Sequence, residues 1–202
     1  MLPDPILVAM VGRSGSSMVS GILHNHGVWV GGSREGNKNN PKGFFENLEL
    51  KTEIRKWAGG NSFRDVPDFK PGWKDKVEGI IRGQGYKDGP WLFKHGATFF
   101  NLWEEFSPKW IKVRRDQRSI FDSYRNSGML STLSDDELKR IISFHHEIMD
   151  MLPGVDVRSE DLINGSYQRL KMAFEYCGLD FDYRIADNFI SKEYWHFSEA
   201  TR

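Results

Sequence analysis

The sequence has one cysteine, Cys177, and therefore cannot form an intramolecular disulfide. Cys177 lies in FEYCGL, at the apolar end of an expected helix, so we expect a buried and unreactive thiol. No stretch reaches the ~20 consecutive apolar residues of a membrane-spanning helix. The beginning, MLPDPILVAMVG, lacks the basic region and cleavage site of a secretory signal. These absences predict a cytoplasmic protein without a membrane partner.

An excess of charge of either sign is also missing. Lys and Arg total 28 and Asp and Glu total 28, so the formal net charge is zero. Because no overall positive field attracts nucleic acid, we expect no nucleic-acid partner, and an anion site must come from a local arrangement of residues. The 202 residues suit one domain with a sizeable core, and we predict a single domain over 1–202.

Apolar runs alternate with helical patterns along the chain. Strands are expected at 5–11, 90–95, 109–115 and 155–159, with a shorter one at 28–32. Helices are expected at 16–26, 47–58, 73–85, 116–127, 134–152 and 166–179. This order predicts an α/β fold, a P-loop-NTPase-like three-layer α/β/α arrangement around a mostly parallel central sheet. Ligands of such folds bind beyond the carboxyl ends of the strands.

The first strand runs directly into the glycine-rich turn GRSGSS, which has the composition of an anion site. The first N–H groups of the following helix have no intrahelical partners, and the helix dipole adds partial positive charge. Glycines permit close backbone approach, serines donate hydroxyls and the arginine adds a fixed charge. The candidate binding residues are Gly12, Arg13, Ser14, Gly15, Ser16, Ser17 and Met18. A turn of this kind that binds nothing is the alternative.

This turn differs from the Walker A loop of nucleotide kinases. The Walker motif is G-x-x-x-x-G-K-[ST], whereas Gly15 is followed by Ser16 and no lysine is present. The missing lysine disfavours a site for a magnesium–triphosphate, so an anion of another kind is expected here.

A second candidate anion site follows the strand at 109–115. Arg115 ends this strand, and Ser123 lies 123 − 115 = 8 residues later, about two turns into the next helix. In a parallel sheet both strands end at the same edge, so Arg115 and Ser123 can bind a second phosphate, well separated from the first. The alternative is a solvated basic helix face.

Taken together, these motifs resemble the sulfotransferases that use 3′-phosphoadenosine-5′-phosphosulfate (PAPS). RSGSS at 13–17 is similar to their first signature, and Arg115 with Ser123 to their second. NNPKGFFEN at 39–47 resembles the N-x-x-G-[FY]-x-E segment of the bacterial and tyrosylprotein branches, and WLFKH resembles their strand with an active-site lysine. VRSEDLINGSYQRLKMAFEYCGLDF at 157–181 is a weaker third match. The resemblance covers nearly the whole chain and implies one sulfotransferase-like domain.

The resemblance implies in-line transfer of a sulfuryl group from PAPS, as co-substrate, to an acceptor hydroxyl or amine without a metal. It implies that the turn at 12–18 holds the 5′-phosphosulfate, while Arg13 and Lys94 supply catalytic cations. The acceptor is left open as a small molecule, a glycan or a peptide. We expect the loops at 31–43 and 59–75 to line the acceptor side, where their composition suits a sugar, a phenol or a peptide.

The general base has two candidates. The resemblance assigns this role to Glu46, whereas the animal cytosolic branch uses a histidine in K-x-H, to which His95 is the nearest equivalent. Lys94 and His95 are adjacent on an expected strand, so their side chains should point to opposite faces. We therefore favour Glu46. The remaining histidines are expected on helix surfaces or near the end of the chain and form no metal site: His24, His26, His145, His146 and His196.

Two departures from the family pattern limit the comparison. Ser159 stands where many members have tyrosine before Glu-Asp-Leu, so we assign no adenine-binding residue, and no R-K-G loop is found. Two alternatives to a sulfotransferase stay open. One is a P-loop kinase or other phosphotransferase, and the other is a non-catalytic relative that binds a nucleotide or glycan.

Overall fold

The structure is a computed structural model that describes residues 2–37, 40–58, 63–68 and 71–191. Its elements, in chain order, are β1 Ile6–Met10, α1 Ser16–Asn25, α2 Leu48–Trp57, α3 Trp73–Gly83, β2 Leu92–Gly96, the 3-10 helix η1 Ala97–Trp103, β3 Lys109–Arg114, α4 Gln117–Ser127, α5 Asp135–Met151, β4 Val155–Arg158, α6 Ser159–Ile163, α7 Gln168–Cys177 and α8 Tyr183–Phe189.

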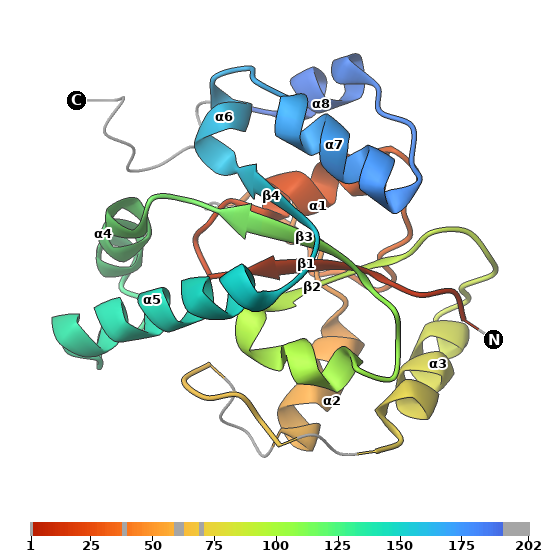
Figure 1. The fold of residues 1–202 in the computed structure, drawn as a ribbon, viewed down its shortest axis with the longest axis horizontal. Helices are drawn as coiled ribbons and strands as arrows, with labels where there is room; N and C mark the ends of the chain where they lie inside the picture. Colours follow the sequence, from red (N-terminus) through yellow and green to blue (C-terminus); the bar gives the residue numbers. More distant parts are fainter. Residues whose placement is uncertain (1, 38–39, 59–62, 69–70, 192–202) are drawn as a thin grey trace.

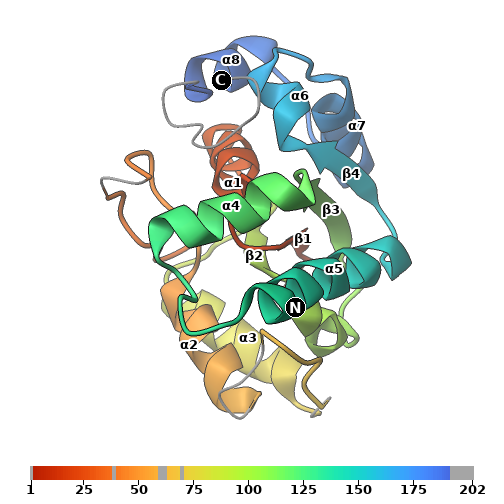
Figure 2. The ribbon, with the colours of Figure 1, turned by 90° about the vertical axis from the view of Figure 1, so that its left-hand side faces the viewer.

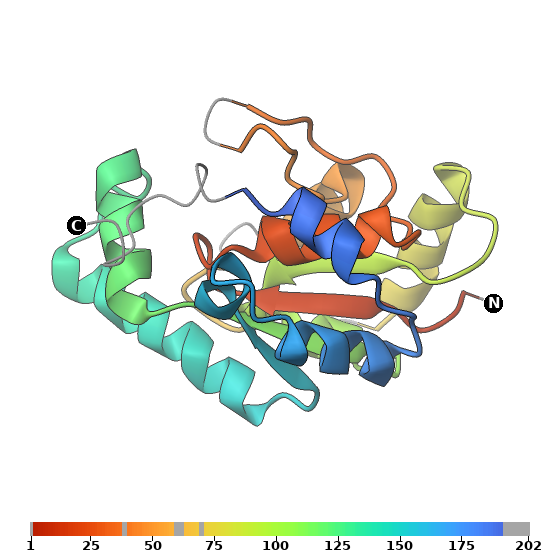
Figure 3. The ribbon, with the colours of Figure 1, turned by 90° about the horizontal axis from the view of Figure 1, so that it is seen from above.

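The four strands form one parallel sheet in the order β2-β1-β3-β4. Alternate residues of β1 enter different cores: Ile6 and Val8 pack with α1, α6, α7 and α8, whereas Leu7 and Ala9 pack with α2, α3, η1, α4 and α5. Figure 1 shows α1, α6, α7 and α8 above the sheet and α2 and α3 below it, with α4 beside the carboxyl ends of the strands, and Figure 3 shows α1, α7 and α8 over the upper face. The predicted three-layer α/β/α fold with a parallel sheet is confirmed.

The strand order creates a switch point between β1 and β3. The chain after β1 rises into α1 on one face of the sheet, while the chain after β3 leads to α4, whose Ile120 and Tyr124 belong to the core of the other face. Because the two connections diverge, a crevice opens beyond the carboxyl ends of these neighbouring strands. Figure 2 looks onto this edge, with α4 crossing in front of the sheet.

Most expected elements occur within one or two residues of their predicted bounds. A capping box begins α5: the Ser134 hydroxyl accepts a hydrogen bond from the Glu137 N–H, and the Glu137 carboxylate accepts one from the Ser134 N–H. The predicted strand at 28–32 is wrong, since only a single parallel bridge joins Trp29 to Trp91 and Gly31 bends the chain at φ 78°. The short helices α6, with five residues, and α8, with seven, were not predicted, because helical periodicity is recognised over windows of about 11–18 residues.

The single cysteine lies at the end of α7. Cys177 is half-buried against the core beside α1, and burial raises the pKa of its thiol to about 12. The thiol is therefore protonated at neutral pH, which agrees with the expectation of an unreactive side chain.

Candidate active site

The glycine-rich turn joins β1 to α1 and leaves the helix N-terminus open. Gly15 is the N-cap, in a left-handed conformation at φ 84°, and no side chain caps the helix. Arg13 also has a positive φ of 70°, which costs strain in a residue other than glycine. Gly12 is required for another reason, because a Cβ there would lie 2.2 Å from the Tyr124 hydroxyl. The turn is thus shaped to present backbone N–H groups to the crevice.

Lys94 brings a buried positive charge to the first turn of α1. Its ammonium donates hydrogen bonds to the Ser17 hydroxyl at 2.9 Å and to the Phe44 carbonyl at 2.5 Å. Lys94 lies on β2 beside Val8 of β1, and only 2% of its surface is exposed. Burial lowers the pKa of this ammonium to about 8, against an opposing effect of the nearby Glu46 carboxylate.

Glu46 precedes α2 and forms ion pairs with two lysines. Its carboxylate lies 3.2 Å from the Lys94 ammonium and is also paired with Lys51 of α2. The Ser33 hydroxyl accepts a hydrogen bond from the Glu46 N–H at 3.0 Å and fixes the backbone. Burial alone would raise the pKa of Glu46, but the attraction of both lysines outweighs it and holds the pKa below the usual range. The carboxylate is ionised at neutral pH and can accept a proton.

The second predicted anion site lies against the first. The Arg13 guanidinium donates a hydrogen bond through Nε to the Ser123 hydroxyl at 2.9 Å, and Arg115 donates one through Nη1 to the Arg13 carbonyl at 3.1 Å. The sequence predicted two well-separated sites. In the structure Arg13 extends from the turn to Ser123, so side chains of the two sites are in contact, and the separation of the two phosphates stays a prediction.

One cleft of about 330 Å³ collects nearly all the predicted residues. The predicted residues that line it are Gly12, Arg13, Gly15, Ser16, Ser17, Met18, Glu46, Lys94, Arg115 and Ser123. Ser14 is not among them: it is fully buried behind the turn, with its hydroxyl unpaired among the described residues. His95 is not among them either.

His95 lines a second, smaller cavity of about 180 Å³ on the other side of β2. Its ring packs edge-on against Phe99, with centroids 3.9 Å apart, and beside Phe93. The predicted divergence of Lys94 and His95 is present in the structure, since Lys94 points to α1 and His95 to the core below the sheet. Burial lowers the pKa of His95 to about 3, so its imidazole is a weak base.

Two other histidines differ from expectation. His145 and His146 were predicted on a helix surface, but both are buried, with 1% and 9% of their surfaces exposed. They lie on the face of α5 that packs against the sheet. His145 Nε2 donates to the Phe63 carbonyl at 3.0 Å, and His146 contacts Arg114. His24 is exposed as expected, and His196 lies outside the described residues.

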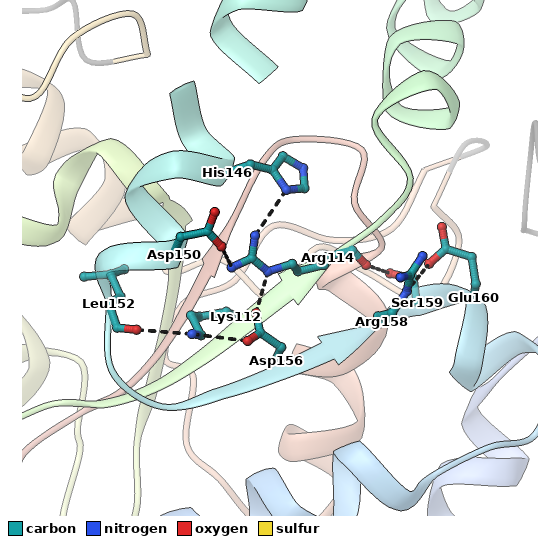
Figure 4. Close-up of polar contacts among 9 residues, drawn as sticks. All are labelled: Lys112, Arg114, His146, Asp150, Leu152, Asp156, Arg158, Ser159 and Glu160. Carbon is teal, nitrogen blue, oxygen red and sulfur yellow. Dashed lines mark hydrogen bonds and ion pairs between the residues drawn. The ribbon is translucent and has the colours of Figure 1, made fainter. Parts of the chain in front are cut away.

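Ser159, the departure from the family pattern, lies between the glycine-rich turn and the end of β3 and contacts the backbone of both. Its hydroxyl contacts the carbonyl of Ser14 in the turn and lies 3.1 Å from the carbonyl of Arg114 at the end of β3. Figure 4 shows Ser159 at this end of β3, while the Arg114 side chain turns away to Asp150, Asp156 and His146. A bulkier residue could not make both contacts, so Ser159 is a structural residue in this chain.

The sequence reasoning missed several residues of the cleft. Lys51 follows Glu46 by five residues and pairs with it, and Lys42 and Phe44 lie in the loop that precedes it. Of the two loops expected on the acceptor side, residues 40 and 42 line the cleft, and Phe63 lines the smaller cavity. Residues 38–39, 59–62 and 69–70 of these loops lie outside the described part. The sequence held no clear signal for the pairing of Lys51 with Glu46, because their spacing of five residues is not the i,i+3 or i,i+4 spacing of helical ion pairs and Glu46 precedes α2.

Comparison with known proteins identifies the fold. No family model and no curated protein matches the sequence. The sulfotransferase domain of the Synechococcus PCC 7002 olefin synthase aligns over 96% of this chain and 80% of that chain, with a TM-score of 0.60 and 15% identity. The sulfotransferase domain from the curacin biosynthetic pathway covers 91% and 77%, with a TM-score of 0.59 and 16% identity. Sulfotransferase STF1 from Mycobacterium tuberculosis H37Rv covers 100% and 75%, with a TM-score of 0.50 and 11% identity.

These likenesses show that the chain has the α/β fold of sulfotransferase domains, as its motifs predicted. Within the described ranges, no helix is both long and apolar enough to cross a membrane. The same ranges hold no cluster of three or more His, Cys, Asp or Glu residues suited to a metal ion.

Proposed function

We propose that this protein is a sulfotransferase that moves a sulfuryl group from PAPS to a hydroxyl or amine of an acceptor, in line and without a metal. One observation supports this proposal above all others. The uncapped start of α1, the group formed by Arg13, Arg115 and Ser123, and the Glu46–Lys94 ion pair all line one cleft. The shared fold with sulfotransferase domains agrees with it.

The cleft residues fit a nucleotide that carries two anionic groups. The Met18 N–H donates to the Gly15 carbonyl, but no side chain caps the helix, so the preceding N–H groups of Ser16 and Ser17 suit the phosphosulfate. Arg115 and Ser123 suit the 3′-phosphate, since a guanidinium and a hydroxyl both donate to phosphate oxygens. When bound, PAPS supplies an activated sulfuryl group with a stable phosphate as leaving group.

The chain's own residues divide the remaining tasks. Lys94 contacts both Ser17 in the turn and Glu46, so its ammonium lies at the junction of donor and acceptor sites and can stabilise charge on the leaving oxygen. Arg13 adds a second fixed charge at the turn. Glu46 accepts the acceptor's proton, because its ionised carboxylate lies beside Lys94 in the cleft, whereas His95 does not line this cleft. The acceptor can be a small molecule, a glycan or a peptide.

Calorimetric titration with adenosine 3′,5′-bisphosphate in the presence of EDTA tests the nucleotide site. We expect saturable binding that needs no magnesium. Arg115→Ala should weaken it about 10- to 100-fold, since a charge-assisted hydrogen bond is lost. Arg140→Ala removes an arginine from the exposed side of α5 and serves as the matched control. Binding of Mg–ATP in place of the bisphosphate would identify a phosphotransferase, and bisphosphate binding without sulfate transfer to any acceptor would identify a non-catalytic relative.

A further inference from the structure

The smaller cavity adjoins the nucleotide cleft and shares a wall with it. Both spaces are bounded by Met10, Gly12, Glu46, Lys51 and Lys94. The Glu46–Lys94 ion pair therefore faces the two spaces at once, at the place where β1 and β2 end. A molecule bound in the smaller cavity can therefore place a polar atom beside Glu46 and Lys94, the residues proposed to act in sulfuryl transfer.

Aromatic rings form most of the wall beyond this pair. They come from Phe63, Phe99, Tyr124, His95 and His145. The rings lie at angles to one another: His95 meets Phe99 at 79°, and Phe63 is tilted 55° to His145 with centroids 5.8 Å apart. Such tilted rings offer both faces and edges to a flat guest.

Four charged side chains also line the cavity. They are Glu46, Lys51, Lys94 and Arg55, which come from α2, the residues before it and β2. The two imidazoles carry no charge at neutral pH, because burial lowers the pKa of His95 to about 3 and also lowers that of His145. The cavity thus combines an ionic wall, most of which it shares with the cleft, with uncharged aromatic rings.

We propose that the smaller cavity is the acceptor site and that the acceptor is a compact phenol, with its ring among the aromatic side chains and its hydroxyl at the Glu46–Lys94 pair. This inference rests on the proposed sulfotransferase function. It selects one acceptor class from the sugar, phenol and peptide that the sequence left open.

Size and polarity both favour a phenol. The volume of about 180 Å³ is close to the ~150 Å³ of a cavity that holds benzene and below the ~300 Å³ typical of sites for larger ligands. A sugar of the same size would place some of its hydroxyls against the rings of Phe63 and Phe99, which offer them no hydrogen-bond acceptor, and this is costly. A peptide would need a longer groove. A phenol has one hydroxyl, which can lie at the Glu46–Lys94 pair while its ring packs against the aromatic side chains.

The chemistry of a phenol also suits a weakened carboxylate base. The two lysines hold the pKa of Glu46 below its usual range, so it removes a proton most readily from an acidic hydroxyl. A phenol, with a pKa near 10, is more acidic than an aliphatic alcohol. Lys94 can in addition stabilise the developing phenolate.

With PAPS as the donor, the bonds formed and broken in the proposed transfer balance. The phenol oxygen forms a bond to sulfur while the bond between sulfur and the bridging oxygen breaks, and its electron pair stays on that oxygen. The bridging oxygen becomes a phosphate oxygen of adenosine 3′,5′-bisphosphate. The phenol proton passes to Glu46 and then to solvent, and the product is an aryl sulfate.

Sulfate transfer from ³⁵S-labelled PAPS to phenol, cyclohexanol and glucose tests the acceptor class. Phenol and cyclohexanol match in size but differ in aromaticity and acidity. We expect kcat/KM for phenol to exceed that for cyclohexanol by at least about 100-fold, with no measurable transfer to glucose. Bisphosphate binding is measured on the same protein by calorimetry, and phenol binding to that complex by saturation-transfer NMR.

The substitution Phe63→Ala tests the contribution of the cavity wall to acceptor binding. Phe63 is half-buried and far from the glycine-rich turn in sequence, so the variant should fold and bind the bisphosphate normally. We expect its KM for phenol to rise about 10-fold with little change in kcat, because a ring contact is lost, and we expect relative activity on 2-naphthol to increase. Phe121→Ala removes an equally half-buried ring outside both cavities and should change neither constant.

The outcomes separate this inference from the function on which it rests. Bisphosphate binding with transfer to glucose or cyclohexanol in preference to phenol, or with no transfer to phenol, would overturn the phenol site and leave the nucleotide site standing. An unchanged KM in Phe63→Ala would also overturn it. Absence of bisphosphate binding would overturn both.

Discussion

At the scale of single residues, the Glu46–Lys94 pair is the most unusual feature of the molecule. Lys94 is almost completely buried, and a buried ammonium is tolerated only when anions and hydrogen-bond acceptors surround it. Here the carboxylate of Glu46, the hydroxyl of Ser17 and the carbonyl of Phe44 fill that role. The ion pair thus keeps a cation in place beside the proposed sulfuryl-transfer position and leaves it available to an anionic ligand.

The first prediction at this scale concerns Glu46 as the base. Glu46→Gln keeps the shape of the side chain but cannot accept the proton, so kcat should fall about 10²- to 10⁴-fold. Calorimetry should show bisphosphate affinity within a few fold of the unchanged protein. Glu104→Gln, at an exposed position, is the control. Full activity of Glu46→Gln would return His95 to consideration as the base, to be tested by His95→Ala.

The second prediction concerns the titration of Lys94. Its pKa of about 8 means that the ammonium loses its proton as the pH rises through this value. Since the charged form is the catalytic one, kcat/KM should decrease above about pH 8. Lys94→Met should be much less active at neutral pH and should lack this alkaline decrease, whereas Lys87→Met, at an exposed position, should retain it. An alkaline limb that persists in Lys94→Met would assign it to another group.

At the scale of elements, the turn between β1 and α1 depends on its neighbour α4. Tyr124 of α4 packs against Gly12 so closely that no side chain fits there, and Ser123 of the same helix holds the Arg13 guanidinium. Ser159, at the start of α6, ties the Ser14 and Arg114 backbones together. The turn is therefore fixed by helices from both faces of the sheet.

A substitution at Gly12 should show this dependence. Gly12→Ala places a methyl group 2.2 Å from the Tyr124 hydroxyl, so we expect a loss of about 1–3 kcal/mol in the free energy of unfolding and weaker bisphosphate binding. Adding Tyr124→Phe removes the closest atom and should restore part of the stability, a coupling that a double-mutant cycle measures. Gly79→Ala, in a helix with open space around the new methyl group, should instead stabilise the protein slightly. Additive effects of the first two changes would contradict direct contact.

At the scale of the whole molecule, the cleft lies at the switch point of the sheet and draws residues from both layers. The turn and α1 belong to one face, α4 with Ser123 belongs to the other, and the segment before α2 supplies Glu46. A ligand bound there contacts elements that are far apart in the sequence. Its binding energy therefore stabilises the packing of the whole domain.

This arrangement predicts a single, ligand-dependent unfolding transition. Adenosine 3′,5′-bisphosphate at 100 times its Kd adds about 2.7 kcal/mol to the free energy of unfolding, which for a domain of this size raises Tm by roughly 5–10 °C. Scanning calorimetry with EDTA present measures the shift. The expected single domain over 1–202 also requires one cooperative transition, and two separate transitions of which only one responds to the ligand would contradict it.

Much of the site could be predicted because its parts are local in sequence. Residue type, together with a position after a strand or before a helix, is enough to recognise the glycine-rich turn, the pair Arg115 and Ser123, and Glu46. The contact of Arg13 with Ser123 and the burial of His145 and His146 could not be predicted. The sequence pattern gives the helical period of α5. It does not show how much of the helix surface the neighbouring elements cover, and this decides whether His145 and His146 are buried.

The sequence by itself determined the α/β order, the glycine-rich turn before α1 and the separation of Lys94 from His95, because strand alternation and helix termini depend only on neighbouring residues. The tertiary structure alone decided that Arg13 of this turn meets Ser123, that Lys51 joins Glu46, and that an aromatic cavity lies behind them. These features arise where β1, β2, β3 and the helices after them meet, and side chains more than 100 positions apart can be placed together only by packing.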